Sequence, residues 1–375
     1  MPTVAEIAAA LEAWAPPASR LDYDNVGLQV GDGRRAVRAV LVALDLTPAV
    51  VEEARALGAD LVVTHHPLLF RPLKRLTADD PAGALALRLA EAGLAYYAVH
   101  TNLDAAPGGV SFALAERLGL EEVRFLEPSE GKLVKLVTFA PADHADAVRR
   151  AMAEAGAGRI GDYEACAFTL RGTGHFRPGA GARPFVGEAG GPEEAVDEVR
   201  IEAEVMRWDL GRVVRAMRAA HPYEEVAYDV YPVEQPATRA GFGAVGALPE
   251  PTTLEALLPL VAERLGAAAL RYSGDPAMRV ARVAVCGGAG AGLIGRALAA
   301  GADAFVTADV TYHRFFEPLD AEGRPRMALV DAGHYETEAL TEALLVDWLG
   351  RRFPGVAFHR TRHRTSPMRT FVRGA

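Results

Sequence analysis

Cysteine is scarce in this 375-residue sequence, and long hydrophobic runs are absent. The two cysteines, Cys166 and Cys286, are too few for a disulfide framework, so a reducing cytoplasm is the expected compartment. No stretch of about 18 consecutive apolar residues occurs, and we therefore expect no membrane span. The first residues lack a basic start followed by an apolar run, so we also expect no signal peptide.

Basic residues are also fewer than acidic ones. The formal net charge is -9, and the 40 basic residues, only three of which are lysines, are scattered along the chain. Proteins that bind nucleic acid usually carry clustered basic residues, so nucleic acid is not an expected partner. The chain is 50% hydrophobic and 24% charged, which is typical of globular proteins. Its length predicts about two or three domains.

Helix and strand patterns alternate along the first third of the chain. Strands are expected at residues 37–44, 60–64 and 95–99, and helices at residues 4–14, 48–57 and 81–92. The strand segments are continuous apolar runs, as in buried parallel strands. The alternation predicts an α/β domain in which helices cover a mostly parallel sheet.

The middle of the chain has a different pattern. Residues 132–233 follow the order β-α-β-β-α-β, which is that of a ferredoxin-like domain. A loop rich in glycine and proline at residues 177–194 is expected to be exposed. The last third returns to an α/β pattern, with strands expected at residues 282–285, 303–307 and 327–330 and helices at residues 293–300 and 338–351.

An internal repeat relates the first and last thirds. A shift of 243 residues places ARALGADLVVT (residues 54–64) on ALAAGADAFVT (residues 297–307), and seven of the eleven residues recur. Chance similarity of two alanine-rich helix–strand units is the alternative, but the shared register of the preceding strand favours duplication. We therefore predict two similar α/β lobes with a ferredoxin-like domain inserted between them.

Histidine and carboxylate residues follow three of the expected strands. They are His65, His66, His100, Asp104, His334 and Glu338. Ligands of open α/β sheets bind beyond the carboxyl ends of strands, so these residues are candidates for one site. A histidine pair alone is more typical of an ordinary polar loop; the three strand ends together favour a metal site.

Six donors exceed the needs of one tetrahedral ion and fit two divalent ions about 3.5–4 Å apart, bridged by Glu338 or Asp104. Mixed histidine and carboxylate ligands suit Zn, Fe, Mn, Co or Ni, and the sequence does not choose among them. Such a pair of ions would ionise a bound water near neutral pH and make it a nucleophile, with His100 or His313 transferring protons.

Other motifs are weaker. Gly290, Gly292 and Gly295 form G-x-G-x-x-G after a strand, but no acidic residue stands at the expected distance, so a dinucleotide site is disfavoured. Asp309 and its neighbours either line the same cleft or serve as turn and capping residues. Asp24 either orients a histidine ligand or is an ordinary turn residue.

The sequence resembles the Nif-three-like proteins, also called GTP cyclohydrolase I type 2 homologues. The resemblance covers nearly the whole chain and rests on DNVGLQVGD, LVVTHHPLLF, HTNLD, GHYETE and HPYEEVAYDVYPVE. It implies two α/β lobes around a dinuclear metal centre, a PII-like or CutA-like insertion, and a toroidal homohexamer built as a trimer of dimers. The implied domains are residues 1–128, 129–237 and 238–375. One departure is Tyr23, where the family usually has tryptophan.

The resemblance also implies metal ligands. His66 and Asp104 would bind one ion, His65 and His334 the other, and Glu338 would bridge them. His100 would lie close by as a proton shuttle.

The expected function is a metal-dependent hydrolase of a nucleotide or phosphoester, with attack on C8 of the purine ring if the substrate is GTP. A non-catalytic metal-binding or regulatory hexamer is the alternative, and a nucleotide-binding oxidoreductase is a third hypothesis that explains none of the histidines.

Overall fold

The computed structural model describes residues 1–371, which fall into two compact units. The first unit comprises Met1–Glu127 together with the described residues from Ala240 on, and the second is Pro128–Arg239. The sequence-based prediction placed the insertion at residues 129–237.

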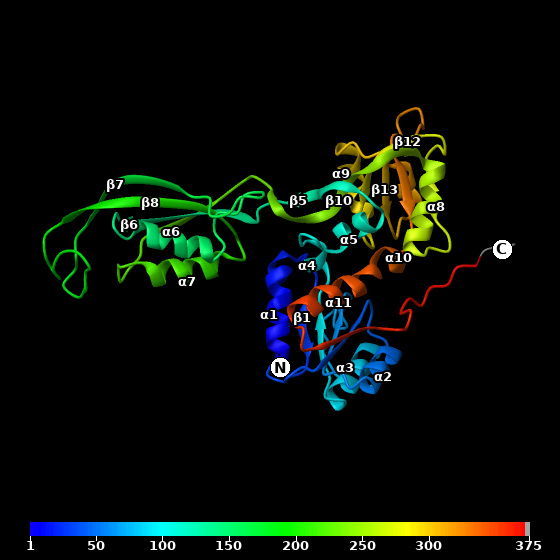
Figure 1. The fold of residues 1–375 in the computed structure, drawn as a ribbon, viewed down its shortest axis with the longest axis horizontal. Coiled ribbons are helices and arrows are strands. Elements are labelled where there is room, and N and C mark those ends of the chain that lie inside the picture. Colours follow the sequence, from blue (N-terminus) through cyan, green and yellow to red (C-terminus); the bar gives the residue numbers. More distant parts are fainter. Residues whose placement is uncertain (372–375) are drawn as a thin grey trace. The chain divides into compact units, whose positions relative to one another are not determined.

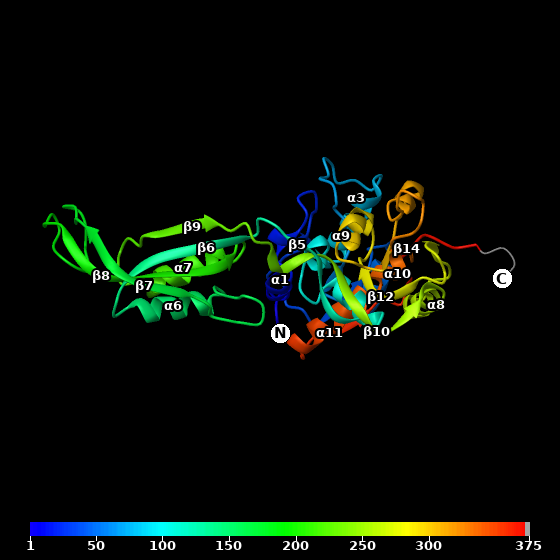
Figure 2. The same ribbon diagram turned by 90° about the horizontal axis from the view of Figure 1, so that it is seen from above.

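The first unit contains two sheets (Figures 1 and 2). The strands of the first sheet, in spatial order, are β1 (Gly27–Val30), β4 (Ala95–Ala98), β3 (Leu61–Thr64), β2 (Ala39–Ala43) and β15 (Ala357–Arg360). Those of the second are β11 (Arg271–Ser273), β14 (Ala328–Asp331), β13 (Ala304–Thr307), β12 (Arg279–Val285), β10 (Ala237–Thr253) and β5 (Glu121–Ser129). In the first sheet β4, β3 and β2 are parallel to one another, and the edge strand β1 is antiparallel to β4. In the second sheet β14, β13 and β12 are likewise parallel, and the edge strand β11 is antiparallel to β14.

The helices of this unit connect the strands. They are α1 (Val4–Trp14), α2 (Pro48–Ala56), α3 (Pro81–Glu91), α4 (Thr101–Asp104), α5 (Val110–Arg117), α8 (Leu254–Leu265), α9 (Ile294–Ala299), α10 (His334–Glu338) and α11 (Leu340–Arg352), with short 3-10 helices η1 (Pro17–Ser19), η2 (Gly290–Leu293) and η3 (Tyr312–Phe316). Helix α1 begins at residue 4 because Thr3 and Glu6 form a capping box. The helix expected at residues 338–351 is observed as α11 (Leu340–Arg352), and the short helix α10, which was not expected, precedes it directly.

The internal repeat is a repeated strand pairing. Val40 pairs with Leu61 between β2 and β3, and the residues 243 positions later, Val283 and Ala304, pair between β12 and β13. Asp60 accepts a hydrogen bond from the backbone N–H of Arg38, and Asp303 accepts the equivalent one from Ala281. The two lobes therefore share register as well as element order.

The lobes exchange elements across the predicted ranges. Strand β15, within the range assigned to the second lobe, pairs in parallel with β2 of the first sheet. Strand β5, within the range assigned to the first lobe, is an edge strand of the second sheet. The sequence does not reveal the exchange, because apolar patterning shows that a strand is buried and not which sheet buries it.

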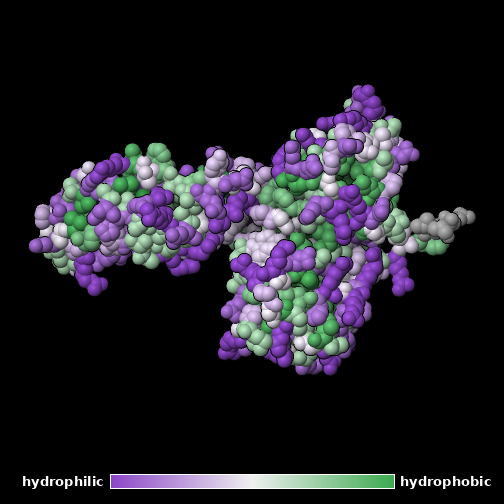
Figure 3. Space-filling model, in the orientation of Figure 1, coloured by the Kyte–Doolittle hydropathy of each residue, from purple (hydrophilic) through white to green (hydrophobic). Residues whose placement is uncertain are grey.

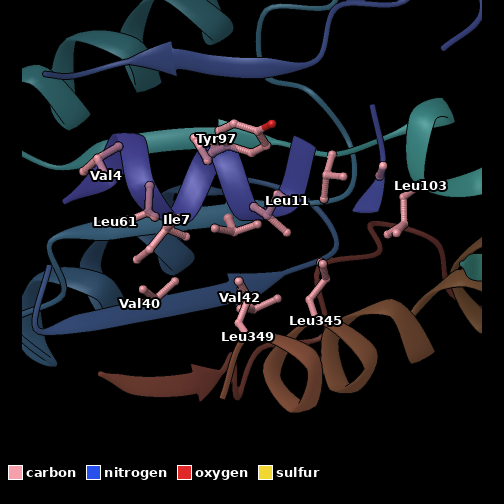
Figure 4. Close-up of a cluster of buried hydrophobic side chains, with 14 of the residues drawn as sticks. Val4, Ile7, Leu11, Val40, Val42, Leu61, Tyr97, Leu103, Leu345 and Leu349 are labelled. Carbon is pink, nitrogen blue, oxygen red and sulfur yellow. The ribbon is translucent and has the colours of Figure 1, made fainter. Parts of the chain in front are cut away.

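A hydrophobic core joins the first sheet to helices from both ends of the chain. Figure 4 shows Ile7 of α1 and Leu349 of α11 among the side chains that pack around β2 and β3. Both side chains are fully buried. The C-terminal helix α11 is thus part of the first lobe's core.

The second unit has one antiparallel sheet with two helices. Its strands, in spatial order, are β7 (Phe168–Phe176), β8 (Glu194–Met206), β6 (Leu133–Pro141) and β9 (Tyr228–Pro232), and its helices are α6 (Ala145–Glu154) and α7 (Leu210–Ala220). The chain order is β-α-β-β-α-β. Both helices contribute to a separate hydrophobic core with β6 and β8.

A buried histidine in this unit makes its stability sensitive to acid. His221 donates to the Phe139 carbonyl from Nε2 and accepts the Tyr223 N–H at Nδ1, so the neutral ring has both nitrogens bonded. Burial lowers the pKa of His221, and the Phe139 carbonyl and nearby Glu198 only partly oppose this, while His144 adds to it. Protonation of His221 Nδ1 would break the hydrogen bond that this atom accepts from the Tyr223 N–H.

We therefore expect acid to weaken this unit through His221. Because the pKa is lowered by folding, stability present above about pH 6.5 is lost as the pH falls below it. A His221→Gln variant, whose amide can replace both bonds, should lose less of its unfolding temperature between about pH 7.5 and pH 5 than the parent. Exposed His175→Gln is the control and should behave as the parent does.

Within residues 1–371, the helices are all too short or too polar to cross a membrane. On the face visible in Figure 3, hydrophilic side chains are spread over both units.

Candidate metal centre

The ends of β3, β4 and β14 bring six sequence-predicted residues together inside the first unit. His65 and His66 follow β3, His100 and Asp104 lie at the start and end of α4 after β4, and His334 and Glu338 lie at the two ends of α10 after β14. His334 and Glu338 share one helix face because they are four residues apart.

Glu338 is the centre of the cluster, and its two oxygens face different histidines. Oε2 lies 2.9 Å from His66 Nε2 and 2.9 Å from His334 Nε2, and these two nitrogens are 3.3 Å apart. Oε1 lies 3.8 Å from His65 Nε2, which is also 3.8 Å from Asp104 Oδ1. The Glu338 side chain is 5% exposed, so these contacts are shielded from bulk water.

The geometry pairs the donors differently from the family-derived prediction. His66 and His334 share Oε2 of Glu338, and His65 and Asp104 lie on the side of Oε1. The prediction joined His66 to Asp104 and His65 to His334. His65 and His66 are consecutive, and their Nε2 atoms approach different oxygens of Glu338, which spacing alone does not assign.

Each of the four histidines is held by its Nδ1 atom. His65 Nδ1 bonds the Val99 carbonyl at 2.8 Å, and the others bond carboxylates: His66 with Asp45 (2.7 Å), His100 with Asp24 (2.9 Å) and His334 with Asp309 (2.7 Å). This leaves the Nε2 atoms directed into the cluster, the usual arrangement around protein metal ions.

Two of these orienting carboxylates, Asp24 and Asp309, were sequence candidates, and Asp45 was missed. Asp45 follows β2 and also accepts a hydrogen bond from the Thr365 hydroxyl. Its position just after a buried strand is the signal that would have identified it.

The cluster has buried polar atoms that lack hydrogen bonds within the described residues. They are His65 Nε2 and Glu338 Oε2. Glu338 Oε2 is close to two ring nitrogens, but not in hydrogen-bond geometry. Buried polar atoms without a partner are rare and call for a bound group. Lone pairs of nitrogen and oxygen converging on one point fit a divalent cation.

The carboxylates and imidazoles perturb each other strongly. Burial raises the pKa of Glu338, but the close imidazoles of His334, His65 and His66 outweigh it and hold the pKa well below its usual range. Burial lowers the pKa of His66, yet Asp45 and Glu338 raise it to about 10. The close carboxylate of Glu338 raises the pKa of His334 to about 9 despite burial.

Asp104 shows the opposite shift. Burial, together with the negative charge of Glu338, raises its pKa to about 7. Protons therefore occupy the cluster at neutral pH, and a divalent cation would displace them on binding.

A glycine allows the chain to pass close to the central carboxylate. Gly288 follows β12 with φ of +58°, and a Cβ there would lie 2.1 Å from Glu338 Oε1 and 3.1 Å from His334 Nε2. Its N–H donates to the Thr337 hydroxyl. In the adjacent G-x-G-x-x-G segment, Gly290 donates to Thr307, so packing against neighbouring strands accounts for this glycine.

His313 is not one of the clustered residues. It is exposed on η3 and belongs to neither of the two groups with metal-ligand spacing that occur among residues 1–371. Those groups are His65, His66 and His100, and His66, His334 and Glu338.

Relatives and solved structures resemble this chain over almost its whole length. The "GTP cyclohydrolase 1 type 2 homolog" proteins of Bacillus subtilis and Mycobacterium tuberculosis are each 40% identical, over 334 and 340 residues, covering 89% of this chain and 88% of theirs. The crystal structure of a Bacillus cereus protein related to NIF3 has a TM-score of 0.85 at 38% identity and covers 99% of both chains. A Staphylococcus aureus protein has a TM-score of 0.76 at 27% identity, covering 98% of this chain and 99% of its own.

The fold and the cluster define an α/β protein with two similar lobes and residues that could hold a metal ion between them. The model of the Duf34/NIF3 family (NGG1p interacting factor 3) matches residues 2–367, and the chain belongs to that family. The family resemblance seen in the sequence is thereby confirmed.

Proposed function

We propose that this protein binds two divalent metal ions around Glu338 and is a metal-dependent hydrolase of a nucleotide or phosphoester. The observation that carries the proposal is the convergence of Nε2 atoms on the two oxygens of one buried carboxylate. His66 and His334 would hold one ion, His65 and Asp104 the other, with Glu338 bridging. Ions in such a site lower the pKa of bound water and stabilise the charge that develops during hydrolysis.

Residues around the cluster provide the remaining functions. His100 holds its Nδ1 proton on Asp24, which fixes its Nε2 toward the cluster and suits it to move a proton during turnover. Exposed Tyr23 and half-exposed Phe70 form an edge-to-face pair, and Phe70 forms another with His100. These rings offer a stacking surface for a purine, consistent with the names of the relatives.

The alternative is a non-catalytic metal-binding or regulatory assembly. The observation in favour of a regulatory assembly is the second unit, which has its own hydrophobic core and contributes no residue to the histidine–carboxylate cluster. We also propose that this unit is a ferredoxin-like, PII- or CutA-like domain, supported by its sheet order. A cytoplasmic homohexamer is the assembly we propose for either function.

Metal content per chain tests the proposal first. We expect about two ions in the parent by plasma mass spectrometry after reconstitution, and a loss of both in His334→Ala/Glu338→Ala. The matched control is His313→Ala/Glu317→Ala, an exposed pair with the same four-residue spacing on η3 and just beyond it, which should keep full metal content. A parent that takes up none of Zn, Mn, Fe, Co or Ni would refute the metal centre.

Hydrolysis of GTP and of p-nitrophenyl phosphate then separates the two functions. The hydrolase requires turnover that disappears in His334→Ala/Glu338→Ala and persists in the control. Metal binding without turnover of either substrate class would favour the regulatory assembly.

A further inference from the structure

The second unit contains a cavity of about 630 Å³, a size typical of small-molecule sites. It lies where β7 and β8 continue past the end of β6: Pro141 is the last residue of β6 to pair with β8, opposite Glu198, whereas β7 pairs with β8 as far as Glu194. The long β7–β8 hairpin can be followed in Figure 1. Pro178, Pro184 and Phe185 of the following loop form part of the wall.

Aromatic rings form much of the lining, and they hold one another in place. The rings are Phe139, Phe176, Phe185 and Tyr223. Tyr223 lies 6.0 Å from Phe176 and 6.1 Å from Phe185, measured between ring centroids. The loop is fastened over this group because Glu224 accepts a hydrogen bond from the Arg183 N–H. Such walls suit a flat, largely apolar ring.

One buried carboxylate faces this aromatic cavity. Glu198 is 9% exposed, and its Oε1 accepts a hydrogen bond of 2.8 Å from the Tyr223 hydroxyl. Its Oε2 lies against Gly174, and a Cβ added to this glycine would be 2.1 Å from that oxygen. Any larger residue at this position would therefore collide with the carboxylate. An ionised carboxylate can accept about four hydrogen bonds, and a single tyrosine leaves most of this capacity unused.

The cations that line the cavity are engaged elsewhere. Arg171 pairs with Asp197 at 2.6 Å, and Arg200 pairs with Glu202 at 3.1 Å. Among residues 1–371, no arginine, lysine or histidine forms an ion pair with Glu198. A buried carboxylate without a cation is costly unless a ligand compensates its charge.

We propose that this cavity binds a small planar cation, an aromatic ring carrying an amidinium-like group with adjacent N–H donors. The ring lies among Phe139, Phe185 and Tyr223, and the N–H donors bond the carboxylate of Glu198. This site contains none of the proposed metal ligands, and the proposal does not depend on whether the metal centre binds ions.

Three probes of the same shape and different charge test the proposal on the full-length protein. Benzamidine, benzamide and benzoate are titrated by ligand-observed NMR. We expect benzamidine to bind with a Kd of about 1 mM or below and at least about tenfold more tightly than benzoate, with benzamide between them. Benzoate binding as tightly as benzamidine, or no binding of benzamidine up to about 10 mM, would overturn the proposal.

Variants place the binding site. Glu198→Gln keeps the shape and removes the charge, and it should weaken benzamidine at least about tenfold. Glu204→Gln is the control, since it removes a charge from the same strand outside the cavity. Unchanged benzamidine affinity in Glu198→Gln would place the cation elsewhere and refute the site.

Discussion

Replacing Gly288 by alanine is expected to abolish metal binding while leaving most of the fold intact. The added Cβ would lie 2.1 Å from Glu338 Oε1, so the central carboxylate must move. The backbone at φ +58° adds a strain of about 1 kcal/mol for a residue other than glycine. Because both proposed ions share Glu338, displacement of this one side chain removes a ligand from each. Metal content per chain measures the effect.

Gly292→Ala is the matched control for this prediction. Gly292 belongs to the same glycine-rich segment, does not have a positive φ, and has no atom within 4 Å of its would-be Cβ. Its metal content should equal that of the parent. If Gly288→Ala retained about two ions per chain while staying folded, Glu338 would not be the bridging group.

The second large effect is expected from Leu349→Ala, which should destabilise the first unit by about 2–5 kcal/mol. Leu349 is fully buried and packs in the cluster formed by α1, β2, β3 and α11 (Figure 4). Removing its side-chain atoms leaves a cavity in a core that joins the C-terminal helix to the first sheet. Denaturant unfolding followed by circular dichroism measures the loss.

Leu76→Ala provides the comparison, because Leu76 is 53% exposed and its truncation removes little buried surface. This variant should unfold within about 0.5 kcal/mol of the parent. Equal stabilities for Leu349→Ala and Leu76→Ala would show that α11 does not contribute to the core of the first lobe.

Local sequence patterns predicted the helices and strands of this protein better than they predicted which of these elements lie side by side. Helix α1 has its predicted ends, Val4 and Trp14, because its capping residues and apolar spacing are encoded within the segment. The six donor residues were found because strand ends are visible in the sequence. The placement of β15 beside β2 was not predicted, since it depends on contacts between distant segments.

Within the metal centre, residue types were predictable and mutual geometry was not. Which side of Glu338 faces His65 and which faces His66 depends on how the two lobes meet. Gly288 was overlooked in favour of Gly290, Gly292 and Gly295, because motif matching does not register a close approach to a side chain. The cavity around Glu198 was also missed, because its walls come from segments that the sequence separates.

The repeated strand pairing places equivalent strand ends of the two lobes in different roles. The 243-residue shift that relates the lobes takes His65 and His66 to Ala308 and Asp309. The second lobe has no histidine pair at the equivalent strand end, and its Asp309 orients His334 instead. The two equivalent strand ends therefore differ in function: one provides a pair of candidate metal ligands, and the other holds a ligand that lies on the helix after the next strand. The cluster is complete only when residues of both lobes come together.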